Sequence, residues 1–205
     1  MKIERFVLGI VGTNTYLVIN EETRQTVLVD PADCPKKLTD HIEEEGLKME
    51  AILLTHGHYD HIMGIDEMLS HYNVPVYAHE AEETLLSDAH ANLSDMTSPY
   101  SYKGARYVKD GDVLTLAGYD FRVLFTPGHT PGGCCYYVES EKILFSGDTL
   151  FCNSVGRTDF PGGSMSQLVR GIKEKLMALP DDTQVLPGHM DFTTIEFERK
   201  YNPFL

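Results

Sequence analysis

The chain has 205 residues, of which 42% are hydrophobic, a size and composition that suit one globular domain with a substantial core over residues 1–205. Its formal net charge of −14 at pH 7 argues against a nucleic-acid partner, because binding DNA or RNA needs a basic surface. No stretch is long and apolar enough for a transmembrane helix, and no signal-peptide pattern is present, so we expect a cytoplasmic protein without a membrane partner.

The first half of the chain alternates between strand-like and helix-like sequence. Runs rich in β-branched and aromatic residues predict strands at residues 3–8, 16–19, 26–29, 51–54 and 76–78. Helices are predicted at residues 35–46, 64–71 and 81–87. Residues 88–103 show no period, and a loop of this length in a compact domain is often functional. We expect this loop to shape a pocket.

The second half is richer in strands. They are predicted at residues 113–116, 121–125, 136–138, 143–145 and 183–186. Helices are predicted at residues 167–179 and 194–200. Because strands outnumber helices and gather in two groups, we expect an α+β fold in which two sheets pack face to face with helices outside.

One short stretch, residues 55–61, concentrates residues that bind metals. Its sequence, THGHYDH, directly follows the apolar run at residues 51–54. Neutral imidazole and carboxylate are ligands that zinc and similar divalent ions prefer. The spacing is too tight and irregular for one helical face, where ligands would recur every three or four residues. A loop after a buried strand can direct such side chains to one point, which predicts a metal site at His56, His58, Asp60 and His61.

Three later strand ends supply further residues of the same types. His129, Asp148 and His189 each follow a glycine, which lets the backbone turn sharply and approach a site closely. Together with the first stretch they make five histidines and two aspartates. That set exceeds the four ligands of one closed structural zinc and suffices for two metals with open positions. The pattern therefore favours a catalytic site.

With these residues placed, the chain resembles the metallo-β-lactamase superfamily over nearly its whole length. The resemblance depends on HxHxDH at residues 56–61, PGHTPGG around His129, SGDTLF around Asp148 and PGH ending at His189. The glyoxalase II-like (hydroxyacylglutathione hydrolase-like) branch is the most similar, particularly its small single-domain bacterial members, through residues 155–163 and 201–204. It implies an αββα sandwich of two mixed β-sheets packed face to face.

The resemblance also implies a role for each residue of the site. His56, His58 and His129 would bind a first metal, Asp60, His61 and His189 a second, and Asp148 would bridge both. Asp30 would support the metal loop from behind, unless it is a plain turn residue. The implied cofactors are two divalent ions, with zinc first and iron or manganese as alternatives. The implied activity is hydrolysis of a small-molecule thioester or ester by a metal-activated hydroxide, with Asp60 and Asp148 as catalytic carboxylates.

The substrate is less well defined by the resemblance. Full-length glyoxalase II-like relatives carry a C-terminal helical region with basic residues for glutathione, whereas this chain stops soon after His189. Arg157 resembles the basic residue of the glutathione loop, so it is a candidate substrate contact, with a structural salt bridge as the alternative. Asp159 stands where that pattern has an aromatic residue, and its carboxylate disfavours glutathione unless it is neutralised.

Two other functions stay open. Persulfide dioxygenases resemble this chain in fold and in most of these motifs and use one iron, which His56, His129 and Asp148 would hold here. The third hypothesis is a metal-binding protein without enzymatic activity. β-Lactam hydrolysis is disfavoured because no export signal is present, and the oligomeric state is left open.

Overall fold

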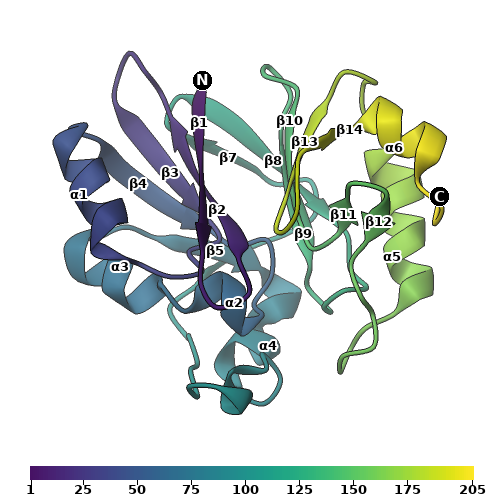
Figure 1. Ribbon diagram of the computed structural model, residues 1–205, viewed down its shortest axis with the longest axis horizontal. Coiled ribbons are helices and arrows are strands. Elements are labelled where there is room, and N and C mark those ends of the chain that lie inside the picture. Colours follow the sequence, from purple (N-terminus) through teal and green to yellow (C-terminus); the bar gives the residue numbers. More distant parts are fainter.

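The computed structural model describes residues 1–205, and two six-stranded sheets form its centre (Figure 1). The first sheet has the strand order β1-β2-β3-β4-β5-β6. Its first three strands are antiparallel, and β3 to β6 run parallel to one another. The bounds are Lys2–Leu8, Thr13–Ile19, Gln25–Val29, Lys48–Leu53, Val76–His79 and Arg106–Val108.

The second sheet has the order β14-β13-β10-β9-β8-β7. Only β10 and β13 are parallel, so this sheet is also mixed. In chain order the strands β7, β8, β9, β10, β13 and β14 span Val113–Leu116, Tyr119–Phe125, Cys134–Val138, Ile143–Gly147, Gln184–Pro187 and Thr193–Thr194. A small two-stranded ribbon, β11 (Leu150–Phe151) and β12 (Ser154–Val155), follows β10.

Helices cover the outer faces of both sheets. In Figure 1, α1 (Lys36–Glu44) and α3 (Ile65–His71) lie on the side of the first sheet, and α5 (Met165–Gly171) and α6 (Ile195–Tyr201) on the side of the second. The short helices α2 (Tyr59–Ile62) and α4 (Glu83–Ser87) lie near one end of the sheets. Single turns occur at Glu80–Glu82, Ser94–Met96 and Ile172–Leu176. No helix has both the length and the apolar composition needed to cross a membrane.

The apolar core has three layers, as four stacked layers of structure require. The middle layer joins the two sheets through residues such as Tyr16, Val29, Phe121 and Phe145. An outer layer packs the first sheet against α1 and α3, and another packs the second sheet against α5 and the turn that follows it. The predicted fold, an α+β αββα sandwich with two mixed sheets, is confirmed.

The structure also corrects the sequence-based elements. The helix predicted at 167–179 starts earlier and changes at Ile172 into a π-helical turn that ends at Leu176. The strands β6, β11, β12 and β14 were not predicted, because two or three residues are too few to show an alternation. Within 88–103 a single 3₁₀ turn forms. The expectation that 55–61 is wholly a loop was wrong, since α2 begins at Tyr59.

Candidate metal centre

Four strand ends deliver the predicted ligands to one place. His56 and His58 follow β4, and Asp60 and His61 lie on the one-turn helix α2 that begins after them. His129 lies in the connection between β8 and β9, Asp148 directly follows β10, and His189 follows β13 by two residues. These ligands therefore come from both sheets, and all seven side chains converge.

The convergent side chains form two groups with a carboxylate between them. The nitrogen atoms of His56, His58 and His129 lie within 4.8 Å of one another, and so do the ligand atoms of Asp60, His61 and His189. Asp148 reaches both groups, since its Oδ1 is 3.5 Å from His61 Nε2 and its Oδ2 is 3.5 Å from His129 Nε2. These two groups are the sets that the family resemblance implies, and a third group of Asp30, His56 and His61 lies equally close together.

Some donor atoms of the cluster pair with one another, such as His58 Nδ1 with His129 Nε2 at 2.9 Å, but three have no partner. His56 Nε2, His61 Nε2 and Asp148 Oδ1 are buried and have no hydrogen-bond partner. Buried polar atoms almost always have a partner, and a bound cation would supply one to these three atoms. Imidazole and carboxylate donors suit zinc, iron or manganese. The residues present thus fit divalent cations.

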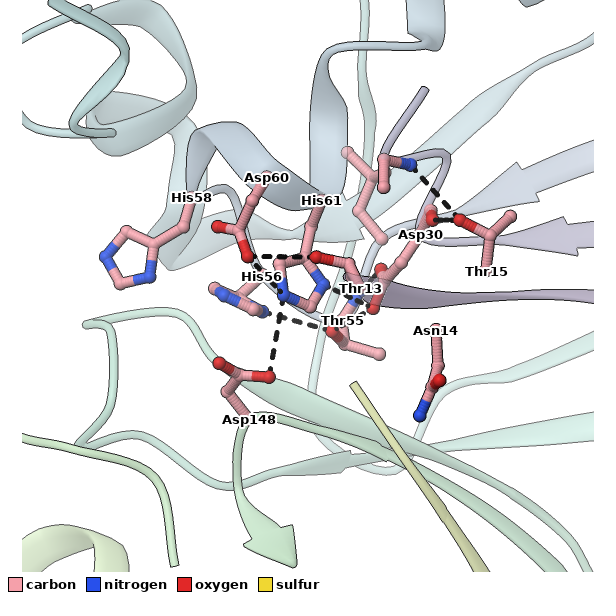
Figure 2. A network of polar contacts seen from close by, with 12 residues as sticks. Thr13, Asn14, Thr15, Asp30, Thr55, His56, His58, Asp60, His61 and Asp148 are labelled. Carbon is pink, nitrogen blue, oxygen red and sulfur yellow. Dashed lines mark hydrogen bonds and ion pairs between the residues drawn. The ribbon is translucent and has the colours of Figure 1, made fainter. Parts of the chain in front are cut away.

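Asp30 fixes the orientation of this cluster from behind, as Figure 2 shows. Its Oδ1 accepts a hydrogen bond from the Thr55 backbone N–H at 2.8 Å, and its Oδ2 accepts one from the Thr55 hydroxyl at 2.6 Å. Oδ2 also lies 2.9 Å from His61 Nδ1. A carboxylate there requires a proton on His61 Nδ1, which makes Nε2 the atom that faces Asp148 and would bind a cation.

A backbone carbonyl group fixes the position of the proton on the His129 ring. Its Nδ1 lies 2.7 Å from the carbonyl oxygen of Arg157, which can only accept, so Nδ1 carries the proton and Nε2 faces the cluster. Thr13, which sequence reasoning missed, donates its hydroxyl proton to Asp60 Oδ2 at 3.0 Å (Figure 2). The only sequence signal for Thr13 is its place in the turn that opens β2.

The histidines are held in different charge states by their surroundings. Burial lowers the pKa of His56 well below 6.5 and, together with nearby His129, lowers that of His58 to about 3. Burial also acts to lower the pKa of His61, but the carboxylates of Asp60, Asp148 and Asp30 outweigh it and raise this pKa to about 10. Without a metal, a proton on His61 balances the carboxylates. A divalent cation would displace that proton.

The pKa values of Asp60 and His189 are also set by burial and by neighbouring charges. Burial acts to raise the pKa of Asp60, but the charges of His61 and His189 outweigh it and hold this pKa well below its ordinary value. Burial acts to lower the pKa of His189, yet its hydrogen bond to Asp60 and the charge of Asp148 raise it. His189 Nε2 lies 3.2 Å from Asp60 Oδ2. Asp60 is therefore ionised at neutral pH and available as a ligand.

Five of the seven predicted ligands line a cavity of about 570 Å³. The side chains that line it are largely apolar. Two of them, Leu93 and Met96, belong to the loop at 88–103, as expected. Besides the ligands His58, Asp60, His129, Asp148 and His189, the lining residues are Val11, Tyr59, Leu93, Met96, Phe151, Ser154, Val155, Arg157, Phe160 and Met190. Sequence reasoning singled out only Arg157 among these, because isolated apolar residues in loops carry no pattern.

Arg157 lies at this cavity with its charge already paired. Its Nε and Nη2 donate to the two carboxylate oxygens of Asp159 at 2.7 and 2.6 Å. Its guanidinium carbon lies 4.0 Å from the centre of the Phe160 ring. The salt bridge that the sequence left as an alternative is therefore present, in a residue that also lines the cavity.

Comparison with known proteins agrees with this geometry. The family model of the metallo-beta-lactamase superfamily matches residues 8–189. A probable metallo-hydrolase of Bacillus subtilis, YqgX, is 40% identical over 208 residues, covering 100% of this chain and 98% of the relative. The hydroxyacylglutathione hydrolase GloC of Haemophilus influenzae is 32% identical, covering 100% and 98%.

Solved structures give the same result. The BLEG-1 B3 metallo-beta-lactamase superposes with a TM-score of 0.94 at 37% identity, covering 100% of this chain and 99% of that one. TTHA1623 in a di-iron-bound form has a TM-score of 0.87 at 37% identity, covering 98% and 100%. ETHE1 from Myxococcus xanthus has a TM-score of 0.79 at 29% identity, covering 99% and 84%.

Proposed function

Because the chain belongs to the metallo-beta-lactamase superfamily, whose members bind divalent metals, we propose that it is a metal-dependent hydrolase of a small-molecule thioester or ester. The observation that supports this most is the pair of ligand groups with Asp148 between them. His56, His58 and His129 would hold one ion, Asp60, His61 and His189 the other, and Asp148 both. Zinc is the first candidate metal, and the di-iron form of TTHA1623 supports iron as an alternative.

The residues around the ions would divide the work of hydrolysis. Two divalent ions supply hydroxide at neutral pH, because they lower the pKa of water from ~15.7 to about 7. Asp60, ionised and anchored by Thr13, would accept a hydrogen bond from that nucleophile and orient it. The apolar cavity walls would hold the acyl group and exclude bulk water, which strengthens electrostatic stabilisation of the carbonyl oxygen. His129 and His61 need no movement, since Arg157 and Asp30 fix their tautomers.

The reference substrate is a hydroxyacylglutathione, as for glyoxalase II. Its support is the similarity to GloC, named a hydroxyacylglutathione hydrolase, over nearly the whole of both chains. The partner is thus a small molecule, and the net charge of −14 supports our expectation of no nucleic-acid partner. We place the protein in the cytoplasm, without a membrane partner.

Metal content and thioester turnover test this proposal together. We expect about two zinc or iron ions per chain in protein purified without chelator, and thiol release that stops with chelator and returns with metal. Asp60→Ala should lower kcat/KM by about a hundredfold or more, whereas Asp40→Ala on the exposed face of α1 should not change it. Full activity of Asp60→Ala at full metal content would exclude the mechanism.

A persulfide dioxygenase with one iron is the second candidate. The similarity to ETHE1, at 29% identity and a TM-score of 0.79, supports it. His56, His129 and Asp148 would hold that iron. About one iron per chain and oxygen uptake with a glutathione persulfide, without thioester turnover, would establish it. Turnover of either kind would exclude a purely metal-binding role.

A further inference from the structure

The pairing of Arg157 with Asp159 bears on which thioester fits the cavity. Arg157 is the only lysine or arginine among the residues that line it. Its Nε–Nη2 edge, the one that would grip a carboxylate with two parallel hydrogen bonds, is already bound to Asp159. A substrate carboxylate would have to compete with the carboxylate of Asp159, which is two residues away in the same chain, in an ion pair whose side chains are 59% and 65% exposed.

The rest of the guanidinium is also constrained. Phe160 covers one face of it, with 4.0 Å between the guanidinium carbon and the ring centre, and the same ring lies 5.5 Å from the ring of His58. Nη1 makes no hydrogen bond. One uncharged acceptor, such as an amide carbonyl, can bind there without disturbing the ion pair.

Apart from Arg157, the predicted metal ligands and the hydroxyl groups of Tyr59 and Ser154, the cavity wall is apolar. Val11, Met96 and Met190 are 50%, 67% and 59% exposed, so the mouth of the cavity presents apolar side chains to solvent. Leu93, Phe151 and Val155 continue this apolar lining. The net charge of −14 further opposes the approach of an anion.

We infer that the cavity selects thioesters whose thiol part is uncharged and bears an amide, rather than glutathione, and that Asp159 sets this preference by neutralising Arg157. The inference rests on the proposed thioester hydrolysis and refines its substrate. Glutathione carries two carboxylates and one ammonium group, and outside the proposed metal centre this cavity has no free side-chain cation to bind the carboxylates. An N-acylcysteamine or pantetheine-like thiol presents only amides to Nη1 and apolar groups to the walls.

Two thioesters with the same acyl group, one of glutathione and one of N-acetylcysteamine, test the inference. In the wild-type enzyme we expect kcat/KM to be about fivefold or more higher for the N-acetylcysteamine thioester. Asp159→Asn frees the guanidinium, so the ratio of the two kcat/KM values should shift about three- to tenfold toward glutathione, mainly through KM. The effect of Asp159→Asn on this ratio should be smaller in roughly 0.5 M salt, because salt screens the attraction between exposed charges.

Asp181→Asn is the matched control, because it removes one carboxylate from an exposed ion pair with Arg199 on a different part of the surface. It should leave the ratio unchanged. A wild-type preference for the glutathione thioester, or an Asp159→Asn effect equal for both substrates, would overturn the inference.

Binding without turnover separates this inference from the proposed function. Calorimetry with non-hydrolysable S-hexyl thioethers of the same two thiols should show tighter binding of the N-acetylcysteamine compound than of the glutathione compound. Asp159→Asn should reduce the difference between the two Kd values. If the protein binds the two thioethers in this order but hydrolyses neither thioester, the proposed hydrolase function is wrong and the inferred preference for an uncharged thiol is supported. The reverse ranking would overturn the preference, whatever the activity.

Discussion

At the scale of single residues, the positions of protons decide whether this cluster can bind a cation. Asp30 has a positive φ of 50°, at the end of β3, and this conformation turns its carboxylate back toward Thr55 and His61. Three hydrogen bonds hold it there. Such outer partners are as much a part of a metal site as the ligands.

Asp30→Asn tests this orientation with almost no change in size. The amide nitrogen would face either His61 or Thr55, which both donate at present, so one contact must be lost. If His61 moves its proton to Nε2, it loses the lone pair that points at Asp148. We expect metal affinity to fall about 10- to 100-fold, measured by competition with a chelator. Asp40→Asn serves as the surface control, and unchanged affinity would make Asp30 a plain turn residue.

Glu82 is a second buried carboxyl, behind the loop of His129. Its Oε1 accepts a hydrogen bond from the Thr130 hydroxyl, and its Oε2 has no partner. Burial raises its pKa from the ordinary 4.5 to about 7, against opposing hydrogen bonds from Thr130 and the Gly132 backbone. The protonated form is therefore favoured by folding.

This raised pKa predicts a pH-dependent stability. The stabilising contribution of protonated Glu82 is complete below pH 4.5 and is lost as the pH rises through about 7. Glu82→Gln cannot titrate, so its stability relative to wild type should increase by up to about 3 kcal/mol between pH 5 and 8. Urea unfolding of both proteins at several pH values measures this difference in the free energy of unfolding. The other titrating groups are the same in both proteins, so their contributions cancel. A difference that does not change with pH would contradict it.

At the scale of elements, two glycines show how tightly the connections fit the site. Gly188 follows β13, and a Cβ atom there would lie 2.3 Å from Asp148 Oδ1 and 2.7 Å from the His61 ring. Gly171 ends α5 with an ordinary helical φ of −57°, and a Cβ atom there would make a normal contact at 3.5 Å with Thr126. The same substitution should thus have opposite effects.

Gly188→Ala should reduce metal content and activity strongly, because the turn cannot accommodate a methyl group beside the Asp148 carboxylate. Gly171→Ala should leave both intact and raise the free energy of unfolding by about 0.5–1 kcal/mol, since alanine loses less backbone entropy in a helix. Metal analysis and denaturant unfolding of the two variants distinguish them. A fully loaded Gly188→Ala enzyme would show that the turn can relax.

At the scale of the whole molecule, the proposed metal ligands come from both sheets. His56 and His58 follow β4 of the first sheet, whereas His129, Asp148 and His189 follow strands of the second. A bound ion would therefore join the sheets at one end of the sandwich. It would also neutralise the carboxylates of Asp60 and Asp148, which are only 12% exposed.

Chelation should therefore lower the stability of the whole fold. A ligand at a hundred times its Kd stabilises the native state by about 2.7 kcal/mol, so we expect the Tm to fall by several degrees in a chelator and recover with metal. The shift should be smaller for Asp60→Ala, which lacks one ligand. Scanning calorimetry measures both. An unchanged Tm after verified metal removal would mean that the sheets are held by their apolar interface alone.

The sequence by itself determined the chemistry of the centre and most of the strands. His56, His58 and His129 could be picked out because each follows a buried strand in a turn, and Asp60 and His61 because they lie in the same short stretch as the first two; these features are local. Strand periodicity and ligand type are written in neighbouring residues, and the order of the strand ends then predicts convergence. The fold class followed from the same patterns and from the family resemblance.

Only the tertiary structure decided which contacts surround those ligands. Asp30 meets His61 across 31 residues, and Thr13 meets Asp60 across 47, distances over which no local pattern operates. The strands β11 and β14 exist because partners lie beside them, since two residues carry no period. The pairing of Arg157 with Asp159, and the apolar wall from separate loops, likewise depend on packing. The type of each candidate ligand can be read from the sequence. The positions of the protons and the shape of the cavity depend on contacts between residues that only folding brings together.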